Sequence, residues 1–119
     1  MIAPPPLGSI EKILVRGVNW IGDTILTMPA LEGLSRLLPN ASITLLVRDH
    51  LRALFRHAPW ANKVLVLPQA RGTALLLEEA RLVRRIKDER FDLALIFPRS
   101  PRAALPGFFA GIPYRVGYA

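Results

Sequence analysis

Short apolar runs alternate along the chain with longer segments in which apolar residues recur every three or four positions. The runs predict five strands: residues 13–15, 42–47, 63–67, 92–97 and 114–118. The longer segments predict helices: one from about Thr24 to near Leu38, a short one through Leu51 and Phe55, one capped by Thr73 and ending around Arg90, and one through Leu105 and Phe109. This alternation predicts an α/β protein with a Rossmann-like, doubly wound parallel sheet and helices on both faces.

The expected order of the strands in this sheet is 3-2-1-4-5. Ligands of such sheets bind beyond the carboxyl ends of the strands, where the strand order reverses. That point lies between the first and the fourth strand, so residues 16–23 and 98–102 are expected to line one crevice. Candidate functional residues are therefore expected in these two loops.

The first loop contains two glycines, Gly17 and Gly22, before a helix. Their spacing is that of a phosphate-binding P-loop, but Asp23 occupies the position where the P-loop requires a lysine. A dinucleotide-binding loop needs three glycines, and Asn19 and Trp20 stand in the middle of that pattern. Asp23 is instead expected to be the N-cap of the helix. On spacing alone, a simple cap at Asp23 and a packing role for Trp20 remain an alternative to a functional role.

Two patches of the chain resemble the bacterial lipopolysaccharide heptosyltransferases. The first is Trp20-Ile21-Gly22-Asp23, which follows an apolar strand and precedes Met28-Pro29-Ala30-Leu31. The second runs from Phe91-Asp92-Leu93-Ala94 through Phe97-Pro98-Arg99-Ser100 to Ala110-Gly111-Ile112-Pro113. The resemblance extends from Ile13 to Tyr118 and is nearest to the heptosyltransferase II type.

This resemblance implies an inverting glycosyltransferase with the GT-B fold, which transfers heptose from ADP-heptose to the inner core of lipopolysaccharide. Residues 13–119 are then the acceptor-binding, N-terminal half of that fold. A C-terminal domain, absent from this chain, holds the nucleotide-sugar donor, so the fragment alone is expected to be inactive. The matching aspartate of the family is the proposed catalytic base, and the resemblance assigns this role to Asp23.

Acceptor contacts are expected from Asn19 and Trp20 in the first loop and from Arg99, Ser100 and Arg102 in the second. Arginine suits bidentate contact with phosphate or carboxylate, and inner-core lipopolysaccharide carries both groups. The family analogue of Arg102 is often basic, whereas Arg99 replaces a polar residue. For both arginines, a solvated position near a helix start is the alternative. Two further arginines at strand ends, Arg16 and Arg48, rank lower as candidates.

The net charge of +7 and the pI of about 11.1 favour an anionic partner. The basic residues are spread along the chain without a helix-turn-helix, zinc-binding or aromatic RNA-binding pattern, so nucleic acid is not the expected partner. The expected partners are the phosphorylated inner-core acceptor and the nucleotide-sugar donor, with peripheral contact to the inner membrane as a further option. No cofactor and no metal is expected, because the chain has no cysteine and His50 and His57 lack further ligand-type neighbours.

Residues 1–12 include three consecutive prolines and are expected to form a flexible tail rather than a signal peptide. No apolar run reaches the ~18–20 residues that a membrane-spanning helix needs, and a cytoplasmic location is the expectation. Two other functions stay open. One is a GT-B transferase that uses another nucleotide sugar, and the other is a non-catalytic α/β module that binds an anionic ligand.

Overall fold

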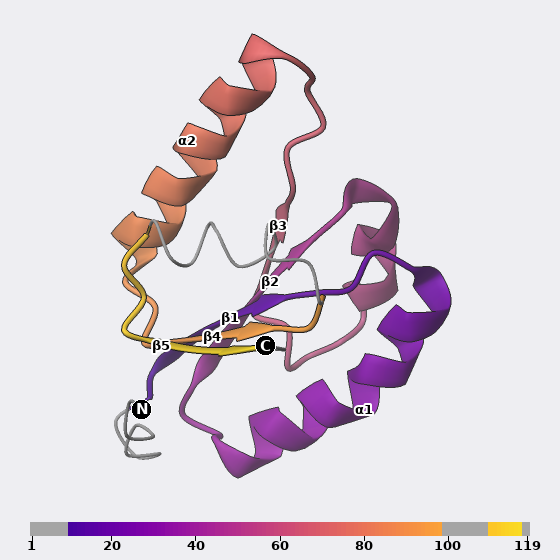
Figure 1. The fold of residues 1–119 in the computed structure, drawn as a ribbon. Helices are drawn as coiled ribbons and strands as arrows, with labels where there is room; N and C mark the ends of the chain where they lie inside the picture. The colour runs from indigo at the N-terminus through magenta and orange to yellow at the C-terminus, as the bar shows by residue number, and fades with distance from the viewer. Residues whose placement is uncertain (1–9, 99–109, 118–119) are drawn as a thin grey trace.

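The computed structural model describes residues 10–98 and 110–117, which form a five-stranded sheet with helices packed against it (Figure 1). The elements follow one another in this order: β1 (Lys12–Arg16), α1 (Ile21–Leu37), β2 (Ser42–Val47), η2 (Asp49–Phe55), β3 (Lys63–Val66), α2 (Thr73–Glu89), β4 (Leu93–Ile96) and β5 (Tyr114–Gly117). The strands lie in the order β3-β2-β1-β4-β5, and every neighbouring pair is parallel. The predicted strand order is therefore confirmed.

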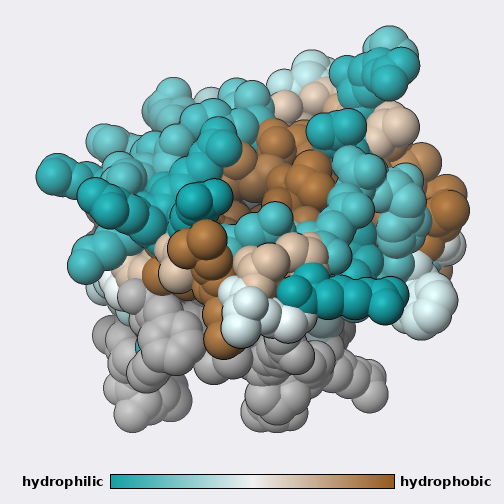
Figure 2. Space-filling model, turned by 90° about the horizontal axis from the view of Figure 1, so that it is seen from above, coloured by the Kyte–Doolittle hydropathy of each residue, from teal (hydrophilic) through white to brown (hydrophobic). Residues whose placement is uncertain are grey.

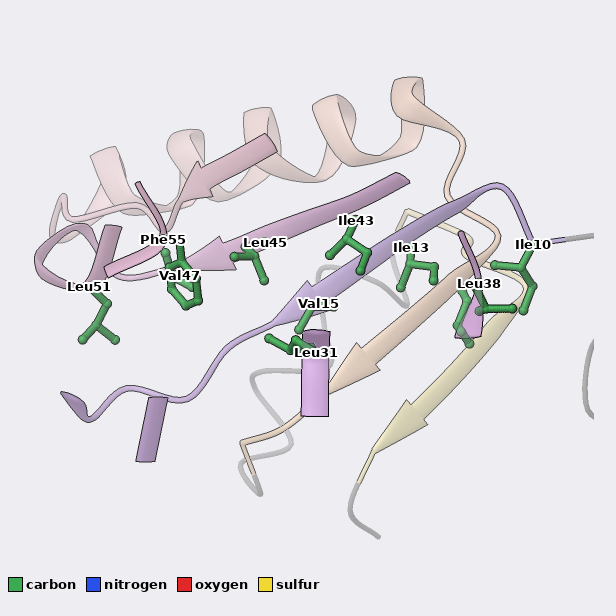
Figure 3. Close-up of a cluster of buried hydrophobic side chains, with 11 residues drawn as sticks. Ile10, Ile13, Val15, Leu31, Leu38, Ile43, Leu45, Val47, Leu51 and Phe55 are labelled. Atoms are coloured by element: carbon green, nitrogen blue, oxygen red, sulfur yellow. The ribbon is translucent and has the colours of Figure 1, made fainter. Parts of the chain in front are cut away.

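Both faces of the sheet are covered, because apolar side chains alternate between the two sides of each strand. On one side, Ile13 and Val15 of β1 belong to a core with Leu31 of α1, and Figure 3 shows Val15 beside Leu31. On the other side, Leu14 of the same strand packs in a second core with Ile86 of α2. Figure 1 shows α1 and α2 on opposite faces, which confirms the doubly wound, Rossmann-like fold class.

Helix α1 begins earlier than the sequence pattern predicts. Its first residue is Ile21, and Trp20 takes the N-cap position with an extended backbone and no side-chain cap hydrogen bond. Asp23 therefore lies inside the first turn, and the prediction that it is the N-cap is wrong. The carbonyl oxygen of Trp20 instead accepts hydrogen bonds from the backbone N–H and the hydroxyl of Thr24, so Thr24 supplies the polar side chain that closes the turn.

Helix α2 shows a similar shift at its start. Its first residue is Thr73, and the N-cap is Gly72, whose φ of 65° lies in the left-handed region that glycine adopts without strain. The prediction of Thr73 as the cap is therefore wrong by one residue. The helix ends at Glu89, and Arg90 follows in the left-handed conformation, close to the predicted end.

The remaining predictions for secondary structure hold wherever the structure describes them. The short helix through Leu51 and Phe55 is a 3-10 helix, and the strand ends lie within one residue of those predicted. The predicted helix through Leu105 and Phe109 falls outside the described residues. Among the described helices, none combines the length and the apolar character that crossing a bilayer demands.

Candidate functional site

The loop that follows β1 starts at the point where the strand order reverses. The carbonyl oxygen of Arg16, the last residue of β1, accepts a hydrogen bond from the N–H of Phe97, which follows β4. On the other side of β1, the N–H of Gly17 donates to the carbonyl oxygen of Leu46 in β2 at 3.0 Å. These bonds fix the start of the loop at the carboxyl edge of the sheet, which is the place expected for a ligand.

Gly17 is required by close packing at this edge. A Cβ added to Gly17 would lie 2.9 Å from Cγ1 of Val47, whose side chain is buried in the core. A Cβ added to Gly22 would meet nothing within 4 Å. The first glycine of the P-loop-like spacing therefore serves the contact between the loop and β2, and the spacing is explained without a phosphate-binding loop.

Arg16 is buried below this loop, with only 7% of its surface exposed. Its Nη1 donates to the carbonyl oxygen of Gly17, and its Nη2 donates to Oδ1 of Asn19 at 3.1 Å. Burial and, to a smaller extent, the neighbouring charge of Arg48 lower the pKa of Arg16 from its usual value to about 10, so the guanidinium stays charged at neutral pH. A buried cation is thus part of the candidate site.

The sequence alone ranks Arg16 below the other candidates, yet it contains a signal for the burial of this residue. Its signal is its place in the strand pattern: it lies two residues after Leu14, and side chains two residues apart point to the same face of a strand. Leu14 belongs to the core below α2, so a residue at position 16 is expected to be covered on the same face. An arginine at such a position is unusual, because charged side chains are rarely buried without a partner.

Trp20 and Asp23 are exposed at the start of α1. Trp20 has 73% of its surface exposed, and Asp23 is exposed in the first helical turn. Neither side chain makes a hydrogen bond or an ion pair within the part of the chain that the structure describes. Both side chains are therefore accessible to a ligand at the carboxyl edge of the sheet.

Further apolar side chains are exposed along the first half of α1: Ile21, Ile25 and Leu26, of which Leu26 is 77% exposed. The one-turn spacing of Ile25, Met28 and Leu31 predicts the helix correctly, yet Ile25 is exposed whereas Leu31 is buried. Seen from above, hydrophobic surface also lies between hydrophilic side chains (Figure 2). Exposed apolar side chains next to a candidate site are typical of binding surfaces.

The second loop is described only as far as Pro98. Arg99, Ser100 and Arg102 lie outside the described residues, so their expected roles stay predictions. The hydrogen bond between Phe97 and Arg16 shows that the second loop leaves the sheet beside the first. Within residues 10–98 and 110–117, no three metal-ligating side chains are grouped.

Comparisons with known proteins support the resemblance. No family model matches the chain. The lipopolysaccharide heptosyltransferase 2 of Escherichia coli (strain K12) is 33% identical over 107 residues, which cover 90% of this chain and 31% of that protein. The structure of the E. coli ADP-heptose lps heptosyltransferase II is similar with a TM-score of 0.77 at 30% identity, covering 89% of this chain and 30% of the other.

A glycosyl transferase family 9 structure from Veillonella parvula shares the fold, with a TM-score of 0.79 at 20% identity over 91% of this chain and 32% of the other. The chain thus spans about a third of the length of the proteins that it matches. The resemblance expected from the two sequence patches is confirmed over nine tenths of the chain. The chain is thus similar to lipopolysaccharide heptosyltransferase 2 proteins over about one third of their length.

Proposed function

We propose that the chain supplies the acceptor site and the catalytic base of an inverting heptosyltransferase. The full enzyme transfers heptose from ADP-heptose to the phosphorylated inner core of lipopolysaccharide. The proposal is carried by the exposure of Asp23 and Trp20 at the carboxyl edge of the sheet, in a chain that is 33% identical to a lipopolysaccharide heptosyltransferase 2. A carboxylate beside an open aromatic ring provides both a base and a surface for a sugar.

Asp23 takes the role of the base in this proposal. Inversion requires a group that removes the proton from the acceptor hydroxyl while the hydroxyl oxygen attacks the anomeric carbon of heptose. The bond between that carbon and the diphosphate of ADP breaks in the same step, and ADP leaves. The carboxylate of Asp23, which is exposed in the first turn of α1, accepts the proton.

The acceptor is held by the two loops. Trp20 offers an exposed ring on which a sugar can pack, and Asn19 offers amide hydrogen-bonding groups. Arg99, Ser100 and Arg102 contact the phosphate or carboxylate groups of the acceptor in this proposal, as the sequence predicts. In this proposal the donor is held mainly by a second domain of the full enzyme, and no cofactor or metal takes part.

The proposal also includes a peripheral contact with the cytoplasmic face of the inner membrane. The net charge of +7 supports attraction to anionic lipid, and the exposed apolar side chains at the start of α1 offer a surface for it. A lipid-linked acceptor is presented at such a surface, so this contact and acceptor binding belong to the same face of the enzyme.

An NMR titration of the chain with two separate ligands tests the proposal. The first ligand is a soluble, phosphorylated inner-core fragment that carries heptose and Kdo, and the second is ADP-heptose. We expect the inner-core fragment to shift the backbone signals of residues 19–23 and 99–102, and ADP-heptose to have little effect. Tight binding of ADP-heptose at these residues would show that the chain is the donor side. No shift with the inner-core fragment would contradict an acceptor site and favour a module for another ligand.

A further inference from the structure

The buried charge of Arg16 has no carboxylate partner among the residues that the structure describes. All nine Asp and Glu residues of the sequence lie within the described ranges. The ion pairs there join Lys12 and Lys63 with Glu89, and two further arginines with acidic residues on their own helices. Two causes lower the pKa of Arg16: its burial and the positive charge of Arg48. No carboxylate is among these causes. A buried charge without a counterion is costly, because it loses hydration without gaining an ion pair.

The second cation, Arg48, lies on the same face of the sheet as Arg16. Arg16 is paired in register with Leu46 of the neighbouring strand, and Arg48 follows Leu46 by two residues in extended conformation. Since side chains two residues apart share a face, Leu46 and Arg48 point to the side that α2 covers. Arg48 is exposed whereas Arg16 is buried, so the pair extends from the interior to the surface. Two cations thus occupy one corner of the carboxyl edge.

Arg16 also fixes the orientation of the amide of Asn19. An arginine can only donate hydrogen bonds, so the atom of Asn19 that faces Nη2 of Arg16 at 3.1 Å must be the oxygen Oδ1. The Nδ2 group of Asn19 therefore points away from Arg16. Within residues 10–98 and 110–117, Nδ2 of the half-buried Asn19 makes no hydrogen bond, so its N–H groups remain available as donors. Nε of Arg16 likewise makes no hydrogen bond to a described residue.

We infer that Arg16, Asn19 and Arg48 form an anion subsite at the carboxyl edge of β1 and β2, which takes a phosphate or carboxylate group of the ligand. The three side chains present hydrogen-bond donors, and the two arginines provide charge that an anion compensates. The subsite lies beside the loop that ends at Trp20, and Asp23 follows in the first turn of α1, so an anionic group can be held there while the rest of an acceptor extends towards α1. The identity of the ligand as a lipopolysaccharide acceptor rests on the proposed function, whereas anion binding does not.

NMR titration of the 15N-labelled chain with inorganic phosphate, at constant ionic strength in chloride, tests the subsite. We expect shifts of the Nδ2 amide signals of Asn19, the Nε signal of Arg16 and the backbone signals of residues 17–19. Mannose 6-phosphate and glucuronate then show whether the subsite prefers phosphate or carboxylate. The absence of shifts at Arg16 and Asn19 with all three anions would overturn the inference.

Three substitutions separate the contributions to binding. Arg16→Met keeps the length of the side chain, and we expect it to weaken phosphate binding by about tenfold or more, because a hydrogen bond to a charged group is lost. Asn19→Asp keeps an oxygen for Arg16 but replaces the Nδ2 donors with a second anionic oxygen, so binding should be lost while the fold is kept. Arg48→Gln should weaken binding by about two- to fivefold, as expected for an exposed charge.

Arg36→Gln is the matched control, because Arg36 is an exposed arginine at the last turn of α1, paired with Glu32. If Arg16→Met fails to fold, the phosphate affinities of Asn19→Asp and Arg48→Gln test the subsite instead. These two variants should fold, because Asn19 is half-buried and Arg48 is exposed. Wild-type phosphate affinity in both would overturn the subsite. The failure of the proposed function can be told apart from the failure of the subsite. If the chain binds phosphate but not the inner-core fragment, the assignment of the acceptor is contradicted and the subsite is not. If Asn19→Asp binds the inner-core fragment with wild-type affinity, the subsite is contradicted and the assignment of the acceptor is not.

Discussion

Thr24 donates two hydrogen bonds to the carbonyl oxygen of Trp20, one from its backbone N–H at 2.9 Å and one from its hydroxyl at 2.7 Å. The side chain of Thr24 is buried, with 1% of its surface exposed. These bonds join the last residue of the first loop to the first turn of α1. They therefore hold the backbone on which both Trp20 and Asp23 are presented.

The first prediction concerns this hydroxyl. Thr24→Val keeps the shape of the side chain but removes one hydrogen bond to Trp20, so we expect the free energy of unfolding to fall by about 0.5–1.5 kcal/mol. Chemical denaturation measures this change. Thr27→Val is the control, because the hydroxyl of Thr27 makes the same kind of bond, to the carbonyl of Thr24, but Thr27 is only half-buried, so the loss of stability should be smaller. Equal stability of Thr24→Val and the wild type would contradict the role of the hydroxyl.

The second prediction concerns the contact between Gly17 and Val47. Gly17→Ala places a methyl group 2.9 Å from Cγ1 of Val47, which is buried and stiff because it branches at Cβ. We expect the free energy of unfolding to fall by about 1–3 kcal/mol, as for other overpacked cores. Gly33→Ala is the control, since its Cβ meets nothing within 4 Å inside α1, and it should stabilise the chain by about 0.5–1 kcal/mol.

A double-mutant cycle sharpens this second test. Val47→Ala removes the methyl groups that the new Cβ of residue 17 would meet, so Gly17→Ala should cost less in that background. The combined loss in the double variant should therefore be smaller than the sum of the two single losses. Additive losses would show that residue 17 needs glycine for a reason other than contact with Val47.

The sheet could be predicted from the sequence because its strands are short apolar runs separated by polar turns. β1 and β2 are buried on both faces, so most of their positions are apolar and their limits are clear. The helix starts were harder to predict. Asp23 and Thr73 are good capping residues by type, yet Trp20 and Gly72 take the cap positions. At the start of α1, the backbone N–H of Thr24 already donates to the carbonyl oxygen of Trp20, so helical hydrogen bonding begins before Asp23.

The candidate site was predictable in place but not in detail. The loop after β1 could be chosen because the strand order fixes where it lies, and Asn19, Trp20 and Asp23 lie in it or directly after it. The burial of Arg16 and its bond to Asn19 depend on the path of the loop, which the pattern of apolar residues does not contain. The exposure of Ile25 likewise depends on which side of α1 meets the sheet.

The third prediction concerns the pH dependence of stability. Glu89 at the end of α2 receives hydrogen bonds from Lys12 of β1 and Lys63 of β3, each at 2.8 Å. The hydrogen bond from Lys12, followed by that from Lys63, lowers the pKa of Glu89 from its usual 4.5 to about 2. As the pH falls, the carboxylate of Glu89 takes up a proton at higher pH in the unfolded chain than in the folded chain. Its contribution to the free energy of unfolding is therefore complete above pH 4.5 and is lost as the pH falls towards 2.

Glu89→Gln tests this prediction by removing the titration. The variant should be less stable than the wild type at neutral pH, and the difference should shrink as the pH falls from 4.5 to 2. Denaturation curves at several pH values measure this convergence. Glu78→Gln, an exposed residue of the same helix, is the control. A constant difference between Glu89→Gln and the wild type at all pH values would contradict the prediction.

The fourth prediction concerns the carboxylate of Asp23 and rests on the proposed function. In an enzyme that contains this chain together with its donor-binding domain, Asp23→Asn removes the proton acceptor but keeps the size of the side chain. Turnover should fall by about 10²–10⁴-fold, which is the usual contribution of a general base. The KM for the acceptor should change little, because the proton is transferred only in the transition state.

Asp88→Asn is the matched control for this fourth prediction. Asp88 is also an exposed aspartate on a helix, but it lies near the end of α2, which leads into the amino end of β4 and so lies at the opposite edge of the sheet. Its substitution should leave turnover unchanged. If Asp23→Asn also retains near-normal turnover, Asp23 acts only through the helix dipole of α1, and the base must come from another residue. A fall in turnover together with an unchanged melting temperature separates loss of the base from loss of the fold.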